Sequence, residues 1–238
     1  MTSLQSPPAA RSKSRFRWVA AVLLVAAVIG GGIGAAIAVS QAPPGGNPNS
    51  LPNFMGLSAL PAKPAPGFSL VDQAGKPVSL SQFRGKSVVL TFMDPKCTDI
   101  CPLVADEFLK AQADLGAKAK GVVFLAVDAN PLATSVADVK AFTTEHGLGG
   151  LHNWYFATAS SATLQKIWNH YGVLVQVDTK TGTVLHGNQI YFIGPGGHER
   201  YLASPADYYI KNGTAFLPAP QLARWGRGIA RYAGKLAT

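Results

Sequence analysis

The chain has 238 residues and a formal net charge of +9 at neutral pH, from 21 basic and 12 acidic residues. Four of the basic residues lie before residue 18, so the rest of the chain carries 17 basic against 12 acidic side chains, a modest excess that does not require a nucleic-acid partner. The sequence shows neither a Walker-type phosphate loop nor an internal repeat.

The N-terminal part predicts a membrane anchor. Residues 18–39 carry no charge, and as a helix they would span about 33 Å, against about 30 Å for the core of a bilayer. Four basic residues and no acid precede this run: Arg11, Lys13, Arg15 and Arg17. We therefore expect a single-pass protein of the cell membrane, with residues 1–17 in the cytoplasm and the bulk of the chain on the outer side. A cleaved signal peptide is the alternative, although the apolar run exceeds the usual h-region of about 7–15 residues.

The remainder divides into a linker and one domain. Residues 40–66 are rich in Pro, Gly, Asn and Ala and predict a flexible linker. Residues 67–238 have the length of a single domain that can bury a core without disulfides.

Strand and helix patterns alternate along this domain. We predict a hairpin over 68–80, strands over 87–93, 121–127, 154–156, 174–177, 184–193 and 199–202, and helices over 102–115, 135–146, 161–171 and 218–236. Such an order predicts an α/β fold, a sheet of mixed strand direction flanked by helices. It is similar to that of a thioredoxin-like fold.

The last predicted helix is basic and amphipathic. Such a helix can lie on anionic lipid or pack its apolar stripe on the sheet. Gly226 and Gly228 would make it a poor free-standing helix, so we expect it to pack.

Cys97 and Cys101, the only cysteines, directly follow the strand predicted over 87–93, and α/β folds bind ligands at such strand ends. Pro102 is favoured at the first position of a helix, so Cys101 is expected at a helix N-terminus, where the dipole favours a thiolate. Two thiols on one short loop can form a disulfide, exchange with a target, or bind a soft metal such as Cu(I) or Zn. A purely structural disulfide is disfavoured, because so short a loop contributes only about 2 kcal/mol.

Six segments resemble the Sco/SenC family of copper chaperones, in the order found there. They are residues 70–80 (LVDQAGKPVSL), 83–86 (FRGK), 91–92 (TF), 97–102 (CTDICP), 171–173 (YGV) and 186–193 (HGNQIYFI). The resemblance implies a thioredoxin-like fold and copper, Cu(I) or Cu(II), bound by Cys97, Cys101 and His186. It also implies a partner, the copper-site subunit of cytochrome c oxidase, whose dinuclear site the family helps to assemble, or another copper protein.

The chain departs from the family pattern at two places. Asp94-Pro95 stands where members usually have a Tyr-Thr pair. Ala133 stands where the second aspartate of an Asp-Pro-x-x-Asp-Thr segment is expected. That acid would support the metal ligands without binding the metal itself. The resemblance therefore does not predict the copper affinity or the redox properties of this chain.

Two classes of function follow. The first is a membrane-anchored copper metallochaperone using Cys97, Cys101 and His186. The second is a thiol–disulfide reductase that keeps target cysteines reduced, in which Cys97 attacks, Cys101 resolves and His186 has no essential part. A peroxidase is a weaker alternative, because no arginine lies near the cysteines in the sequence to activate a peroxide.

Overall fold

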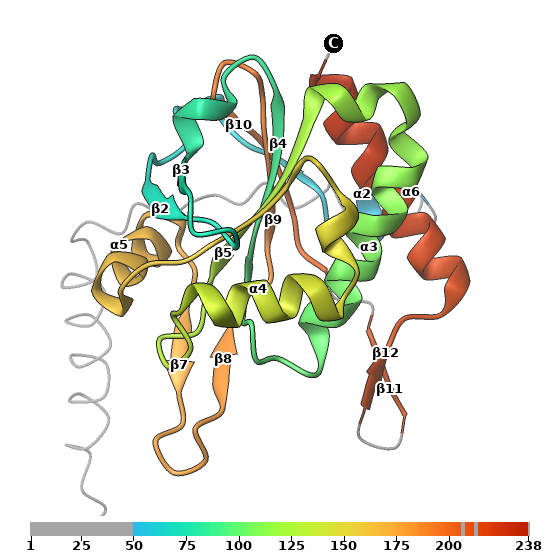
Figure 1. Ribbon diagram of the computed structural model, residues 1–238. Helices are drawn as coiled ribbons and strands as arrows, with labels where there is room; N and C mark the ends of the chain where they lie inside the picture. The colour runs from blue at the N-terminus through green and yellow to red at the C-terminus, as the bar shows by residue number, and fades with distance from the viewer. Residues whose placement is uncertain (1–49, 206–207, 212–213, 238) are drawn as a thin grey trace, which may run out of the picture. The chain divides into compact units, whose positions relative to one another are not determined.

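The computed structural model describes residues 50–205, 208–211 and 214–237. A six-stranded sheet forms the centre of this region, in the order β1-β10-β9-β4-β5-β6 (Figure 1). Its strands are β1 (Ser58–Ala59), β4 (Ser87–Met93), β5 (Val122–Asp128), β6 (Trp154–Ala157), β9 (Ile190–Ile193) and β10 (Glu199–Ala203). β4, β5 and β6 are parallel, whereas β9 is antiparallel to β4, and β10 is antiparallel to β9 and β1. The predicted mixed sheet is confirmed.

Helices cover both faces of the sheet. They are α2 (Leu51–Phe54), α3 (Ile100–Leu115), α4 (Val136–Glu145), α5 (Ser161–Tyr171) and α6 (Ala219–Leu236), with short 3-10 helices at Leu80–Phe83, Gly116–Gly121 and Leu148–Gly150. Side chains of α3, α4 and α6, among them Phe108, Phe142 and Ile229, form one core cluster with the sheet. α5 contributes Leu164 and Trp168 to a second cluster on the other face. Every residue of β4 and β5 is buried, as strands covered on both faces require.

Three hairpins complete the domain. They are β2 (Ser69–Val71) with β3 (Pro77–Ser79), β7 (Val175–Val177) with β8 (Val184–His186), and β11 (Tyr209–Lys211) with β12 (Thr214–Phe216). The first confirms the hairpin predicted over 68–80. The single strand predicted over 184–193 is wrong: the chain leaves β8 at His186 and enters the central sheet as β9 only at Ile190. The β11–β12 hairpin was not predicted.

The linker predicted over 40–66 is wrong from residue 50 onward. Residues 51–54 form α2, Met55 is fully buried in the core, and β1 pairs with β10 at the edge of the sheet. The sequence did not reveal this contribution because prolines, a glycine, an asparagine and serines are interspersed among the apolar residues. Within the described ranges no helix is long and apolar enough to cross a membrane. The predicted membrane span, residues 18–39, lies outside the described residues, as does the rest of the linker.

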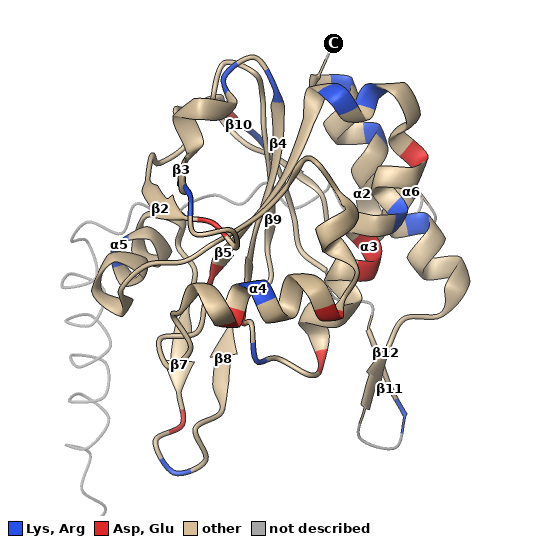
Figure 2. Ribbon diagram, viewed as in Figure 1, with Lys and Arg blue, Asp and Glu red and all other residues tan. Residues whose placement is uncertain are grey.

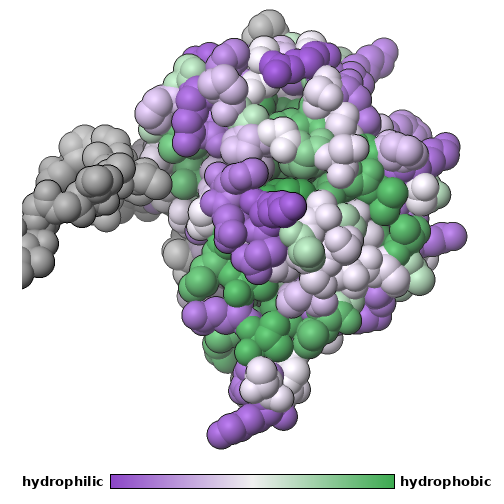
Figure 3. Space-filling view, turned by 90° about the vertical axis from the view of Figure 1, so that its left-hand side faces the viewer, coloured by the Kyte–Doolittle hydropathy of each residue, from purple (hydrophilic) through white to green (hydrophobic). Residues whose placement is uncertain are grey.

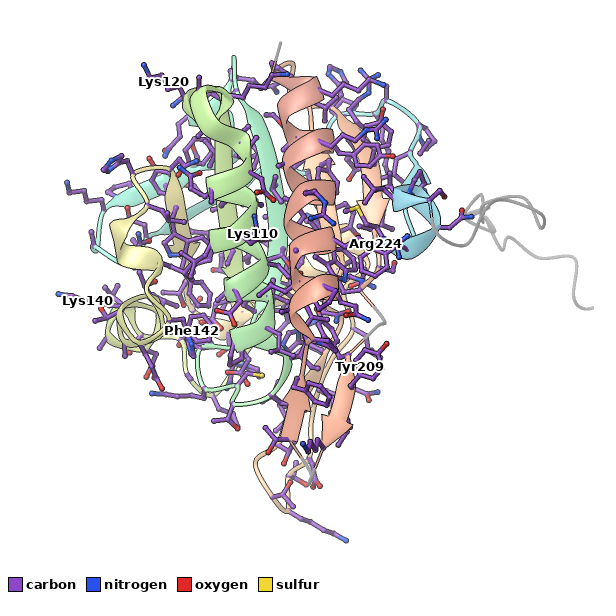
Figure 4. All side chains as sticks on the ribbon, turned by 90° about the vertical axis from the view of Figure 1, so that its right-hand side faces the viewer. Lys110, Lys120, Lys140, Phe142, Tyr209 and Arg224 are labelled. Atoms are coloured by element: carbon purple, nitrogen blue, oxygen red, sulfur yellow. The ribbon has the colours of Figure 1, made fainter. Side chains whose placement is uncertain are left out.

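The glycines of α6 allow close packing. A Cβ on Gly226 would lie 2.3 Å from Cγ and 3.1 Å from the backbone carbon of Lys110 in α3. A Cβ on Gly228 would lie 2.3 Å from Sδ of Met55. α6 therefore lies close against α3 over its length (Figure 4), with Trp225 and Ile229 fully buried. The expectation that this helix packs its apolar stripe into the domain is confirmed.

A glutamine closes the outer edge of the sheet at β6. The side chain of Gln73 accepts a hydrogen bond from the backbone N–H of Phe156 (2.8 Å) and donates one to the carbonyl of Trp154 (3.2 Å). Val71 and Thr158 form an isolated antiparallel bridge beside it. The loop after β2 thus takes the place of a further strand.

Candidate metal and thiol site

The two cysteines lie where β4 passes into α3. The helix begins at Ile100, two residues before the predicted start, so Cys101 lies in its first turn and Pro102 is its third residue rather than its first. No side chain caps the helix at Asp99. Instead Sγ of Cys97 accepts the backbone N–H groups of Cys101 (3.4 Å) and Asp99 (3.5 Å). The sulfur of Cys97 therefore occupies the position of a capping oxygen.

The two thiols differ in environment. Both are free; Cys101 is buried and Cys97 is partly exposed. A hydrogen bond between the two sulfurs, with further backbone N–H donors, lowers the pKa of Cys97 to about 6. The same bond, together with burial, raises the pKa of Cys101 well above its usual value. At neutral pH the pair therefore holds a thiolate on Cys97 and a proton on Cys101.

His186 faces this pair from the end of β8. Its Nε2 lies 3.7 Å from Sγ of Cys101, although 85 residues separate them in the chain. Its Nδ1 lies 3.0 Å from the carbonyl oxygen of Gly187, which can only accept a hydrogen bond. This contact favours the tautomer with the proton on Nδ1, which leaves Nε2 as the ring nitrogen that can bind a metal.

A polar network holds the loop that carries the thiols. Asp94 is buried; its backbone N–H donates to Sγ of Cys101 (3.4 Å), and its Oδ1 accepts from Nδ2 of Asn130 and the backbone N–H of Lys96, both at 2.7 Å. Sequence reasoning missed Asn130, which gave no signal beyond its place after β5. The ammonium of Lys96 forms an ion pair with Asp138 at 2.6 Å.

A cavity of about 500 Å³ opens at the site, and of the two cysteines Cys97 lines it. It is lined by the loop from Asp94 to Ile100, by Asn130, and by residues 182–186 and 188. Three exposed leucines lie nearby, Leu132 and Leu174 on loops and Leu185 in β8, each more than 60% exposed. Hydrophobic surface also gathers on the lower part of the face shown in Figure 3. The β7–β8 hairpin projects from the lower end of the domain in Figure 1. No arginine is among the described lining residues, which does not favour a peroxidase.

The remaining candidate residues lie apart from the site. Ala133, which replaces the expected aspartate, is buried. The ring of His146 packs on that of Phe142 at 4.2 Å between centroids. The other histidines, His152, His170 and His198, are exposed, and none lines this cavity. Within the described ranges no group of three or more His, Cys, Asp or Glu side chains stands ready-made around a metal position.

The parallel strands β4 to β6, the antiparallel strands β9 and β10, and a dithiol where β4 meets α3 define a thioredoxin-like protein. The chain belongs to the SCO1/SenC family: the model of that family matches residues 59–208. β11, β12 and α6 lie beyond the matched residues.

Individual proteins agree with this assignment. The SCO1 protein homolog of Bacillus subtilis (strain 168) is 25% identical over 132 residues, which cover 55% of this chain and 68% of that protein. The crystal structure of a SCO1/SenC family lipoprotein from Bacillus anthracis shares the fold with a TM-score of 0.58, at 24% identity over 74% of this chain and 97% of the other. ScoI of Bradyrhizobium japonicum with copper bound shares it with a TM-score of 0.54, at 21% identity over 71% and 99%.

Proposed function

We propose that the protein is a copper metallochaperone that binds copper through Cys97, Cys101 and His186. The observation that carries this proposal is the approach of His186 Nε2 to within 3.7 Å of Cys101 Sγ, beside the only other thiol. Bond lengths of about 2.3 Å to a thiolate and about 2.0 Å to an imidazole, as around zinc, separate two donors on one metal by about 3.5–3.7 Å at tetrahedral or trigonal angles. The 3.7 Å separation in the structure lies within this range.

The donor set suits copper as cargo. Thiolate sulfur selects Cu(I), and an imidazole lets the same site accept Cu(II). Cys97 is already a thiolate near neutral pH, whereas Cys101 has to lose its proton on binding. A disulfide between the two sulfurs would abolish the site.

Transfer needs a partner that reaches the thiols. The cavity is open, and exposed Leu185 beside His186 offers apolar surface for a protein contact. We propose that the partner is the copper-site subunit of cytochrome c oxidase or another copper protein, and that copper passes to it by ligand exchange. We further propose that residues 18–39 anchor the chain in the cell membrane with the domain outside.

Copper stoichiometry of the reduced protein tests the site. We expect one copper per chain, and its loss in both Cys97→Ser and Cys101→Ser. His170→Ala, which removes an exposed histidine away from the cavity, is the control and should retain copper. Unchanged copper binding in the double Cys→Ser variant would disprove the proposal that the protein is a metallochaperone.

A thiol–disulfide reductase is the second candidate, favoured by the lowered pKa of Cys97 beside a protonated Cys101. The Cys97 thiolate would attack a target disulfide and release one target thiolate. Cys101 would then displace the second, leaving a Cys97–Cys101 disulfide and a reduced target. His186→Ala separates the two functions: for a chaperone, copper affinity and oxidase assembly fall together while disulfide reduction persists. Intact assembly with copper binding lost would favour the reductase.

A further inference from the structure

The end of α3 and the outer side of α6 form an open groove of about 910 Å³, whose lining combines four cations and one acid with leucine and alanine side chains. We call it the basic groove. Its charged lining residues are Asp114, Lys118, Arg227, Arg231 and Lys235, and Leu51 of α2 contributes to its wall. Figure 2 shows Lys and Arg gathered on the same part of α3 and α6.

Three of the cations of the groove, Lys118, Arg227 and Arg231, form no ion pair with the described part of the chain. The one acid, Asp114, forms its ion pair with Lys110 of the preceding turn. The side chains of the three cations are exposed, and Lys120 adds a further exposed cation nearby in the chain (Figure 4).

The packing of α6 turns these cations outward. The inner side of the helix is buried through Trp225, Ile229 and Ala233, so it has no apolar stripe left to insert into lipid. The exposed charged residues of α6 are Arg227, Arg231 and Lys235. An open surface that carries this charge is suited to an anionic plane.

The chain joins the domain at this groove. Arg224 donates a hydrogen bond to the carbonyl of Ser50 (3.3 Å), and its guanidinium lies over the ring of Phe54 at 4.1 Å. Only residues 40–49 separate this point from the apolar run that ends at Val39. Ten residues of flexible chain have a root-mean-square span of about 16–19 Å. If the run is a membrane anchor, as proposed above, the basic groove lies within reach of the bilayer surface.

We propose that the basic groove docks the domain on the anionic surface of the bilayer that holds its anchor. Phospholipid phosphates would lie against Lys118, Arg227 and Arg231. α3 has 16 residues, about 24 Å of helix, between the groove at its C-terminal end and the thiols at its N-terminal end. Docking therefore directs the thiol cavity away from the membrane, toward a partner that projects from it.

The test uses the full chain reconstituted in vesicles with the domain outside. The recognition sequence of a specific protease is inserted between Gly45 and Gly46. The protease then separates the domain from the anchor, and the fraction of the domain that sediments with the vesicles is measured. On vesicles with about one third phosphatidylglycerol we expect the wild-type domain to stay bound. Each basic residue at the lipid surface should raise the binding constant about fivefold. It should leave pure phosphatidylcholine vesicles, and in about 1 M salt, where the Debye length is about 3 Å, it should leave both.

Matched variants locate the surface. The double variant Arg227→Gln, Arg231→Gln should lower the binding constant for the phosphatidylglycerol vesicles about 30-fold, since two cations are lost. Lys140→Gln with Lys166→Gln removes the same charge from exposed positions on α4 and α5 and should change nothing beyond the long-range effect of net charge. All four positions are exposed, so both variants should fold, which circular dichroism checks.

Several results would overturn the proposal. They are release of the wild-type domain from phosphatidylglycerol vesicles, equal loss in the control variant, and equal retention on phosphatidylcholine. Release by millimolar inorganic phosphate or by soluble polyglutamate, at unchanged ionic strength, would indicate a site for free anions or for an acidic protein instead. Copper stoichiometry of the released domain keeps the proposals separate: a released domain that still binds one copper overturns only the docking surface.

Discussion

Asp128, at the end of β5, is a fully buried acid two residues before Asn130. Its Oδ2 lies 2.7 Å from Oγ1 of Thr158, and that hydroxyl also lies 3.0 Å from the carbonyl oxygen of Thr134. A hydroxyl has one proton, so it cannot donate to both oxygens at once. A protonated Asp128 removes the conflict by donating to Thr158, which then donates to Thr134. Burial raises the pKa of Asp128 to about 7, which agrees with this arrangement.

The pKa of Asp128 predicts a pH dependence of stability. Between the usual aspartate pKa of 3.8 and the folded value of about 7, the folded state holds a proton that the unfolded state has lost. This contribution is fully present below about pH 4 and is lost as the pH rises through 7. Asp128→Asn keeps the group neutral and can donate to Thr158, so we expect it to gain about 2–4 kcal/mol relative to wild type between about pH 5 and pH 8.

Denaturant unfolding of the reduced, copper-free protein at several pH values measures this difference. Asp178→Asn serves as the control, because Asp178 is exposed and its pKa is lowered by the backbone N–H of Lys180. It should show no such gain. A parallel pH profile for wild type and Asp128→Asn would rule out a buried proton at this position.

The sequence located part of this site. Spacing and position after a core strand singled out Cys97 and Cys101 as a candidate pair, and the resemblance singled out His186. Neither the spacing nor the resemblance could predict the 3.7 Å distance between His186 and Cys101. This distance depends on how the β7–β8 hairpin and α3 each pack in the domain. Asn130 and the ion pair of Lys96 depend likewise on long-range neighbours, and a lone asparagine or lysine carries no distinctive pattern.

At the scale of the elements, the glycines of α6 differ in the space that surrounds them. Alanine in place of glycine usually favours a helix by about 1 kcal/mol. At Gly226 a Cβ would collide with the stem and backbone of Lys110, whereas at Gly234 it would meet only side-chain ends, 3.2 Å from Cδ of Lys118 and 3.3 Å from Cδ2 of Leu115. Alanine would gain the same helix propensity at both positions, but the steric cost of its methyl group would be larger at Gly226.

We therefore expect Gly226→Ala to destabilise the domain by about 1–2 kcal/mol, since overpacking costs about 1–3 kcal/mol against that gain. Gly234→Ala should be neutral or slightly stabilising. Unfolding midpoints in denaturant, with unchanged slope, compare the two. Equal or greater stability of Gly226→Ala would mean that α6 and α3 are not in close contact at this point.

Most elements were predictable because their patterns are long or strongly apolar. The helices predicted over 135–146 and 161–171 agree with α4 and α5 to within a residue. The β11–β12 hairpin was missed because its strands have three residues each and a mostly exposed surface. α2 and β1 were missed for a similar reason, since the buried residues in and between them, Met55, Leu57 and Ser58, lie in a segment with the composition of a linker.

At the scale of the whole molecule, the arrangement in the membrane stays a prediction. Basic residues ahead of an apolar run should keep the N-terminus inside and hold the folded domain outside. Protease added to right-side-out vesicles should remove the domain, and the anchor should resist alkaline carbonate extraction. Full protection of the domain would contradict this topology, and release by carbonate would indicate a cleaved signal peptide.

The hydrogen bonds of Gln73 matter most where copies of the chain are crowded. Molecules confined to a membrane plane meet one another at a far higher local density than the same number in solution. On the membrane arrangement proposed above, an edge strand with free backbone groups would often meet the same edge of another copy. With its side-chain amide on Phe156 and Trp154, Gln73 leaves fewer free backbone groups on β6 for such pairing. One residue in a loop thereby helps to keep neighbouring domains separate.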